Sequence, residues 1–260
     1  MISDLLLLSG VDIPFPAAQV SIHQPTIKEI AYISEETFFI GCELLNFSKD
    51  TLLSEDKTRL KDQSNFDIIM SIMKDKSNPA LHKNALSALM VLILLFPDYT
   101  VQIRKDYIAL IKSTEIEENI NGVIQKKQQF EEFAINNKNY QEFQEILVQM
   151  FCLSNEKAKE YNPNGDLAQK IADKLKKGEM QRAADKGQHE KIAVLCRYAS
   201  ILAVGESKDL NQLMHYTVYQ LFDEFQRYEL KMNYDNYLQA KMAGAKDLKE
   251  VDNWMKDIHS

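Results

Sequence analysis

Residues able to bind a metal ion are few and scattered along this chain. Its five histidines and three cysteines form neither a His-x-x-x-His nor a Cys-x-x-Cys pair, the spacings typical of zinc sites. His189 and Cys196 are seven residues apart and would share one side of a helix, but two ligands make only half a site. We therefore expect a solvated histidine, a buried cysteine and no bound metal.

A second candidate for metal binding is the turn at residues 162–166 (NPNGD). Asn162, Asn164 and Asp166 alternate as the first ligands of a calcium loop do. However, Gly165 does not stand at the sixth position, where such a loop has its glycine, and Asp173 stands where a bidentate glutamate is needed. The pattern favours a plain turn followed by a helix cap.

Signatures of catalysis and of phosphate binding are also missing from the sequence. Its eight glycines include no Gly-x-Gly, and there is no Gly-x-Ser-x-Gly nucleophile elbow. The acidic pairs are adjacent residues, which on a helix point about 100° apart instead of converging on a substrate. These pairs are Glu35–Glu36, Glu117–Glu118 and Glu131–Glu132. We expect no catalytic residue, no cofactor and no enzymatic activity.

The distribution of charge argues against nucleic acid as a partner. The net charge is −7, and the residues from Ser154 onward carry 17 basic and 17 acidic side chains, so the whole excess lies before Ser154. An acidic surface repels phosphate. Four lysines between residues 154 and 191 are better explained as a solvated helix face than as a nucleic-acid site: Lys170, Lys174, Lys176 and Lys177.

The cysteines and the apolar segments predict a cytoplasmic protein. Cys42, Cys152 and Cys196 are odd in number and far apart, unlike a disulfide framework. The N-terminus lacks the basic region of a signal peptide and carries Asp4. The longest apolar run, at residues 88–96, is too short to cross a bilayer.

The first part of the chain combines helices with a small β element. Residues 11–16 and 20–23 alternate as extended segments do, and Pro25 fits the first position of a helix. Residues 99–103 and 107–111 are expected to pair across a turn at residues 104–106. Further helices are expected with caps at Asn65, Asn78 and Asn139, and the apolar end of the helix before Pro97 should be buried on all sides.

The remainder of the chain is expected to be helical. Residues 154–191 are charged and read as a partly helical connector, with a short helix at residues 166–177. Residues 192–204 and the segment after Thr217, with Gln220 completing a capping box, form further helices. We therefore predict a mainly α protein of the α+β type: an acidic N-terminal domain (1–153), the connector (154–191) and a helical C-terminal domain (192–260).

Three aromatic residues near the C-terminus are candidates for binding a partner. Tyr216, Tyr219 and Trp254 have amphipathic rings of the kind enriched at protein interfaces. Packing within the chain and binding to a partner explain them equally well. Phe222 and Phe225 are best explained as core residues.

Four segments resemble the tail assembly chaperones of long-tailed bacteriophages of Gram-positive bacteria. They are residues 24–30 (QPTIKEI), 94–99 (LLFPDY), 217–225 (TVYQLFDEF) and 240–249 (AKMAGAKDLK), the last followed by Trp254. The resemblance implies an adaptor in the cytoplasm of the infected host, which coats the tape measure protein and recruits tail tube subunits before leaving. It brings no catalytic residues with it.

Two other functions are compatible with the sequence. One is a permanent virion component, such as a baseplate, neck or tail protein. The other is a host-directed enzyme or inhibitor, which would require a deep pocket lined by converging polar side chains. A self-associating chain is also compatible, whereas nucleic acid and membrane are not expected as partners.

Overall fold

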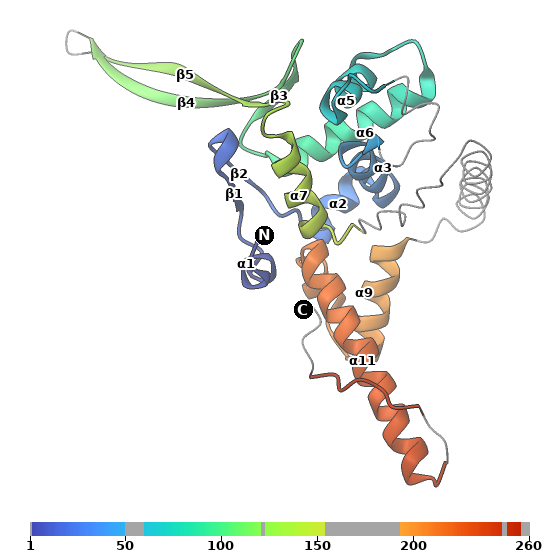
Figure 1. Ribbon diagram of the computed structural model, residues 1–260. Coiled ribbons are helices and arrows are strands. Elements are labelled where there is room, and N and C mark those ends of the chain that lie inside the picture. The colour runs from blue at the N-terminus through green and yellow to red at the C-terminus, as the bar shows by residue number, and fades with distance from the viewer. Residues whose placement is uncertain (1, 50–59, 121–122, 154–192, 246–248, 256–260) are drawn as a thin grey trace, which may run out of the picture.

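The fold combines helices with two small antiparallel sheets and adds a helical C-terminal part. The computed structural model describes residues 2–49, 60–120, 123–153, 193–245 and 249–255 (Figure 1). The strands are β1 (Ile13–Phe15), β2 (Val20–Ile22), β3 (Thr100–Ile103), β4 (Ile108–Ile120) and β5 (Val123–Ile135). The helices are α1 (Asp4–Ser9), the 3₁₀ turn η1 (Pro16–Ala18), α2 (Ile27–Ile33), α3 (Glu35–Leu45), α5 (Asn65–Lys74), α6 (Pro79–Leu95), α7 (Tyr140–Met150), α9 (Val194–Gly205), α10 (Leu210–Leu213) and α11 (Val218–Met242). The predicted α+β class is confirmed.

The β structure consists of two antiparallel sheets in the first part of the chain. Strands β1 and β2 pair with each other, and β3, β4 and β5 form a second sheet in that order. The predicted pairing around the 104–106 turn is confirmed, with Val101 opposite Leu110. The continuation of β4 and β5 into a long hairpin that leaves the body of the protein was not predicted (Figure 1).

Aromatic side chains fill the centre of the N-terminal core. Phe15, Phe38, Phe66, Phe96 and Phe143 are fully buried. Their contacts join separate elements: Phe38 meets Phe151 edge to face at 4.9 Å, and Phe15 lies 6.0 Å from Phe143. The same cluster of buried residues continues through Leu195, Leu202 and Leu221, so α9 and α11 share a core with the N-terminal helices.

Helices α3 and α6 approach each other closely at Gly41. A Cβ atom at this position would lie 2.5 Å from the Ser87 carbonyl oxygen and 2.6 Å from Val91 Cγ2. Glycine is therefore needed here because the backbone of α6 occupies the space that a side chain would take.

Two predicted helix starts were wrong by one or two residues. Helix α2 begins at Ile27, so Pro25 precedes it, because Thr26 forms the cap and shares a capping box with Glu29. Helix α5 begins at Asn65 itself, since Ser64 caps it together with Asp67. The predicted cap at Asn78 is confirmed. Asn139 stands at the predicted N-cap position of α7, but its side chain forms no hydrogen bond to the helix start.

The expectation that the end of α6 is buried on all sides was wrong. Ala88, Val91, Leu92 and Leu95 are buried, as an amphipathic helix requires, but Met90 is 44% and Ile93 50% exposed. Within the described residues, no single helix is long and apolar enough to cross a membrane. Helices α5 and α6 reach that length and composition only as a pair bent by 109°.

Some expectations fall on strands or lie outside the described residues. Glu117–Glu118 and Glu131–Glu132 belong to strands β4 and β5, so the helical geometry expected for these pairs was wrong. Glu35–Glu36 do lie in the first turn of a helix, α3. The calcium-like turn, the four connector lysines, the 166–177 helix and His189 all lie outside the described residues.

Candidate partner-binding surface

The N-terminal end of α11, which we call its root, is held against the N-terminal part of the chain by two adjacent capping boxes. Thr217 and Gln220 cap α11 as predicted, in the same way that Thr26 and Glu29 cap α2. The two caps meet, because Thr26 and Thr217 form an antiparallel bridge and the Ile27 N–H donates to the Tyr216 carbonyl at 2.8 Å. Each helix start thus satisfies backbone groups that helix ends normally leave without partners.

Helix α1 adds a second set of contacts to the same root. The Gln220 side chain donates through Nε2 to the Leu8 carbonyl at 2.7 Å, and the Tyr219 hydroxyl donates to Asp4 Oδ1 at 3.1 Å. Gly10 ends α1 with a φ of 70°, which a side chain would strain. The apolar N-terminal residues thus form a capped helix that supports α11.

Helix α9 packs along the first half of α11 through aromatic rings. Tyr198 stacks on Phe225 with 3.7 Å between the ring centroids and meets Phe222 edge to face at 5.1 Å. Gly205 is the last residue of α9, one residue beyond the predicted helix at residues 192–204, and a Cβ there would overlap the Tyr228 hydroxyl. The two helices therefore form a closely packed pair.

A cleft of about 300 Å³ lies where α9, α11 and the end of α7 meet. Aromatic rings and a few polar groups line it, including Tyr198, Tyr219, Phe222, Asp223, Gln226 and Cys152. Asp223 is buried and accepts from Arg227 Nε at 3.2 Å. Such a cleft can accept an apolar side chain and offer polar groups at its rim.

The Cys152 thiol in this cleft is protonated at neutral pH. Loss of water around the sulfur and then the nearby charge of Asp223 raise the pKa of the thiol to about 11. Because the thiolate is the reactive form, Cys152 is a poor nucleophile. Burial likewise raises the pKa of the Cys42 thiol.

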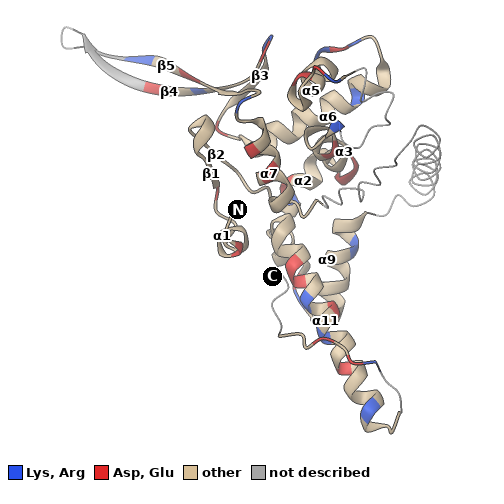
Figure 2. Cartoon of the chain, viewed as in Figure 1, with Lys and Arg blue, Asp and Glu red and all other residues tan. Residues whose placement is uncertain are grey.

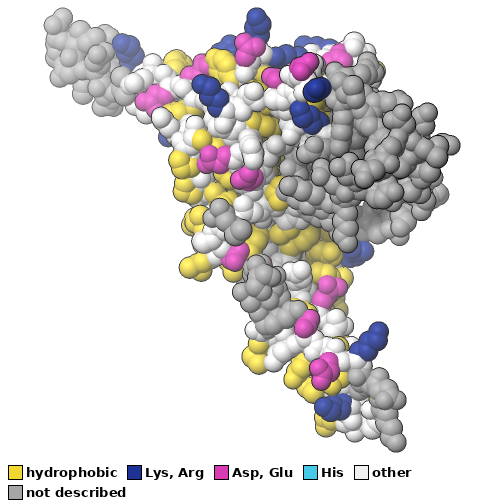
Figure 3. Space-filling model, in the orientation of Figure 1, with side chains coloured by type: hydrophobic (Ala, Val, Ile, Leu, Met, Phe, Trp, Pro, Cys, Tyr) yellow, Lys and Arg dark blue, Asp and Glu magenta, His cyan; other side chains and the backbone are white. Residues whose placement is uncertain are grey.

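Beyond Phe225, α11 continues as a surface helix. We call residues 226–242 the C-terminal arm; it contains no buried residue. Met232, Leu238 and Met242 are exposed on it, between charged side chains of both signs (Figures 2 and 3). Exposed apolar groups on a surface helix are available for contact with a partner.

The three predicted partner-binding residues have different surroundings. Tyr219 is only 6% exposed and packs within the chain. Tyr216 is half-buried beside the Lys208 ammonium, which lies 5.7 Å from the ring centroid, and Trp254 is 38% exposed. Met232, Leu238 and Met242 were not among the predicted partner-binding residues, because no pattern in the sequence separates an exposed apolar position of a helix from a buried one.

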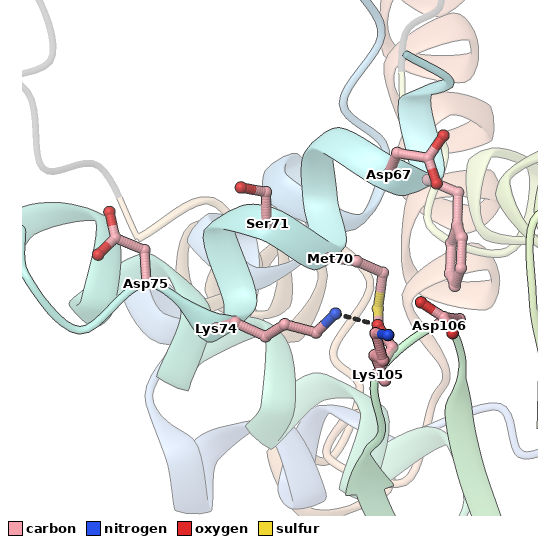
Figure 4. Close-up of a pocket in the computed structure, with 8 residues that line it drawn as sticks. Asp67, Met70, Ser71, Lys74, Asp75, Lys105 and Asp106 are labelled. Carbon is pink, nitrogen blue, oxygen red and sulfur yellow. Dashed lines mark hydrogen bonds between the residues drawn. The ribbon is translucent and has the colours of Figure 1, made fainter.

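A second hollow, of about 450 Å³, lies between α5 and the β3–β4 turn (Figure 4). Its polar groups are engaged locally: the Lys74 ammonium donates to the Lys105 carbonyl, and the Asp67 carboxylate accepts from Ser64. Hydrogen bonds from the Ser64 hydroxyl and backbone lower the pKa of Asp67. These contacts cap α5 and fasten it to the turn.

The histidines of the described residues are isolated from one another. His23 lies between two carboxylates, with Nδ1 3.0 Å from Asp12 and Nε2 3.4 Å from Glu29. No group of three or more side chains suited to hold a metal ion occurs in the part of the chain that the structure describes. Cys196 is exposed there, in contrast to the buried cysteine that was expected.

Comparison with known proteins gives one match, over the C-terminal helices. A family model described as the YomV second domain matches residues 187–259, a range that includes α9, α10, α11 and Trp254. This match points to a phage-type protein family. No curated protein and no solved structure matches the chain.

Proposed function

We propose that this chain is a non-enzymatic phage tail assembly chaperone, which binds the tape measure protein and recruits tail tube subunits in the cytoplasm of the infected host. The observation that carries the proposal is the C-terminal arm, a helix that leaves the shared core with apolar side chains exposed. The match over this part of the chain to a phage-type family supports it.

The arm and its root suit a helical partner. Exposed Met232, Leu238 and Met242 can pack against the apolar stripe of an amphipathic helix, and methionine adapts its shape to different partners. The cleft at the root can take an aromatic or aliphatic anchor from the same partner, since anchors in pockets dominate binding energy. Tape measure proteins are long amphipathic helices, which fits this mode of binding.

The arm keeps a fixed orientation relative to the N-terminal part of the chain, because its root is held firmly. Because α11 is capped and joined to both α1 and α2, the arm and the acidic N-terminal part behave as one body when a partner binds the arm. A chaperone of this design could hold the tape measure protein with its C-terminal part and present its N-terminal part to tail tube subunits.

Co-purification with the tape measure protein encoded by the same phage tests the proposal. Met232→Glu and Leu238→Glu place charges in the apolar positions of the arm, and we expect at least a tenfold loss of bound tape measure protein, equivalent to about 1.4 kcal/mol each. Asn233→Glu and Asn236→Glu add the same charge at exposed polar positions and should bind normally. Undiminished binding by both arm variants, with circular dichroism unchanged, would contradict the proposal.

The only tryptophan gives an independent measurement. Trp254 is the single tryptophan of the chain, so its fluorescence reports on this one position. Titration with a tryptophan-free helical fragment of the tape measure protein should shift its emission to shorter wavelength if the ring becomes covered. Abundant copies of the chain in purified virions would instead favour a structural role in the particle.

A further inference from the structure

The β4–β5 hairpin is a two-stranded ribbon with unpaired edges. Strand β3 pairs with β4 only at residues 108–111, and β5 is the outer strand of its sheet. Beyond residue 111, the described residues therefore provide neither edge of the ribbon with a neighbouring strand. An isolated two-stranded ribbon is at best marginally stable in water, and a free edge is a template for another strand.

The order of charges along the outer strand is self-complementary. Lys127 and Lys126 lie two and three residues before Gln129, and Glu131 and Glu132 lie two and three residues after it. All four side chains are exposed. If two β5 strands pair antiparallel about Gln129, each lysine lies opposite a glutamate of the second copy. Opposite charges in directly facing positions stabilise a sheet, whereas like charges destabilise it.

The exposed phenylalanine of the ribbon fits the same register. Phe130 is 63% exposed and lies opposite Ser113 on β4, a residue too small to cover its ring. In the register centred on Gln129, Phe130 faces Gln128 of the second copy and is the diagonal neighbour of its Phe130. Both rings then lie on one face of the sheet, about 7–8 Å apart along the diagonal, within reach of each other.

The contacts inside each chain are compatible with this pairing. A strand residue has a lateral neighbour on either side, so Lys126 can keep Glu115, 3.3 Å away, while facing Glu132 of the second copy. Glu132 accepts a hydrogen bond from the Tyr107 hydroxyl at 2.7 Å within its own chain. Near its base, the strand is secured to η1 through Asn139, whose Nδ2 donates to the carbonyls of Ala134 and Ala17.

We propose that two copies of this chain associate through β5, antiparallel and centred on Gln129, so that their three-stranded sheets become one continuous sheet. The charges of the ribbon, drawn on its strands in Figure 2, and the exposed Phe130 specify a second copy as the occupant of this edge. The inference concerns a different surface from the C-terminal arm and does not rest on the proposed function.

Complementary charge variants test the register. We expect the wild-type full-length chain to sediment as a dimer, and both Lys126→Glu/Lys127→Glu and Glu131→Lys/Glu132→Lys to dissociate at least tenfold more readily. An equimolar mixture of the two variants should form a heterodimer, because the facing charges are again opposite. A monomeric wild-type chain, or two variants that dimerise as tightly as the wild type, would overturn the proposal.

A cysteine at the centre of symmetry tests the same register by chemistry. In Gln129→Cys, the new residue faces its own copy across the strands at about 4.5–5.5 Å between Cα atoms, within the range of a disulfide. In Gln128→Cys, the two cysteines are diagonal and beyond that range. Oxidation should give a 129–129 linked peptide, identified by mass spectrometry, in the first variant only; its absence there would refute the register.

Discussion

Replacement of Gly41 by alanine is the most direct test of the close packing between α3 and α6. The added Cβ would lie 2.5 Å from the Ser87 carbonyl oxygen and 2.8 Å from its carbonyl carbon, both backbone atoms that cannot rotate away. An extra carbon in a well-packed core costs about 1–3 kcal/mol. Alanine's better helix propensity offsets about 1 kcal/mol of this cost. Because the contact is with backbone, we expect a net loss of about 2 kcal/mol in the free energy of unfolding.

Urea unfolding followed by circular dichroism measures this loss. Glu43→Ala, at an exposed position of the same helix, is the matched control and should change stability by less than about 0.5 kcal/mol. Val91→Ala removes the side chain that lies 2.6 Å from the new Cβ, so the double variant should lose less than the sum of the two single losses. Gly41→Ala with wild-type or greater stability would refute the packing described for these helices.

Three further changes test the caps and the cleft. Thr217→Ala should lower the free energy of unfolding by about 1 kcal/mol in urea titrations, while Thr217→Ser should retain most of the cap. The lowered pKa of Asp67 means that its carboxylate stabilises the fold above its ordinary pKa of 3.8, and this contribution disappears as the pH falls through the folded value. In acid unfolding, Asp67→Asn should therefore lose less stability than the wild type over that range. Alkylation of Cys152 by iodoacetamide, followed by mass spectrometry, should still accelerate between pH 9 and its pKa of about 11, and a plateau near pH 9 would contradict the raised pKa.

Local signals in the sequence predicted most of the helix starts and one strand pair. Caps at Asn78 and Thr217 are short-range features, in which a side chain satisfies N–H groups two or three residues away. The pairing of residues 100–103 with 108–111 follows from alternation across a tight turn. These caps and this strand pair depend on residues close together in the sequence, so the sequence alone was enough to predict them.

Features that depend on distant parts of the chain were missed. Apart from Phe130, residues 126–132 of β5 carry exposed polar side chains on both faces, so no alternation marks this stretch as a strand. The exposed positions of α6 could not be separated from its buried ones, because Met90 and Ile93 are as apolar as Val91. The Tyr219 hydroxyl donates to Asp4, more than 200 residues earlier in the chain, and no spacing in the sequence indicates that contact.

The bridge between Thr26 and Thr217 also dictates an order of events during synthesis. A ribosome releases α1 and α2 long before it has made α11, so in the nascent chain the N–H groups of Ile27 and Lys28 still lack the carbonyls of Tyr216 and Met214. The buried cluster that contains Leu7 also contains Val218 and Leu221, so it too is incomplete until α11 has been made. The first helices can therefore reach their final packing only when translation is nearly complete. A chain that stopped early would leave apolar residues exposed and would tend to aggregate instead of forming a smaller functional protein.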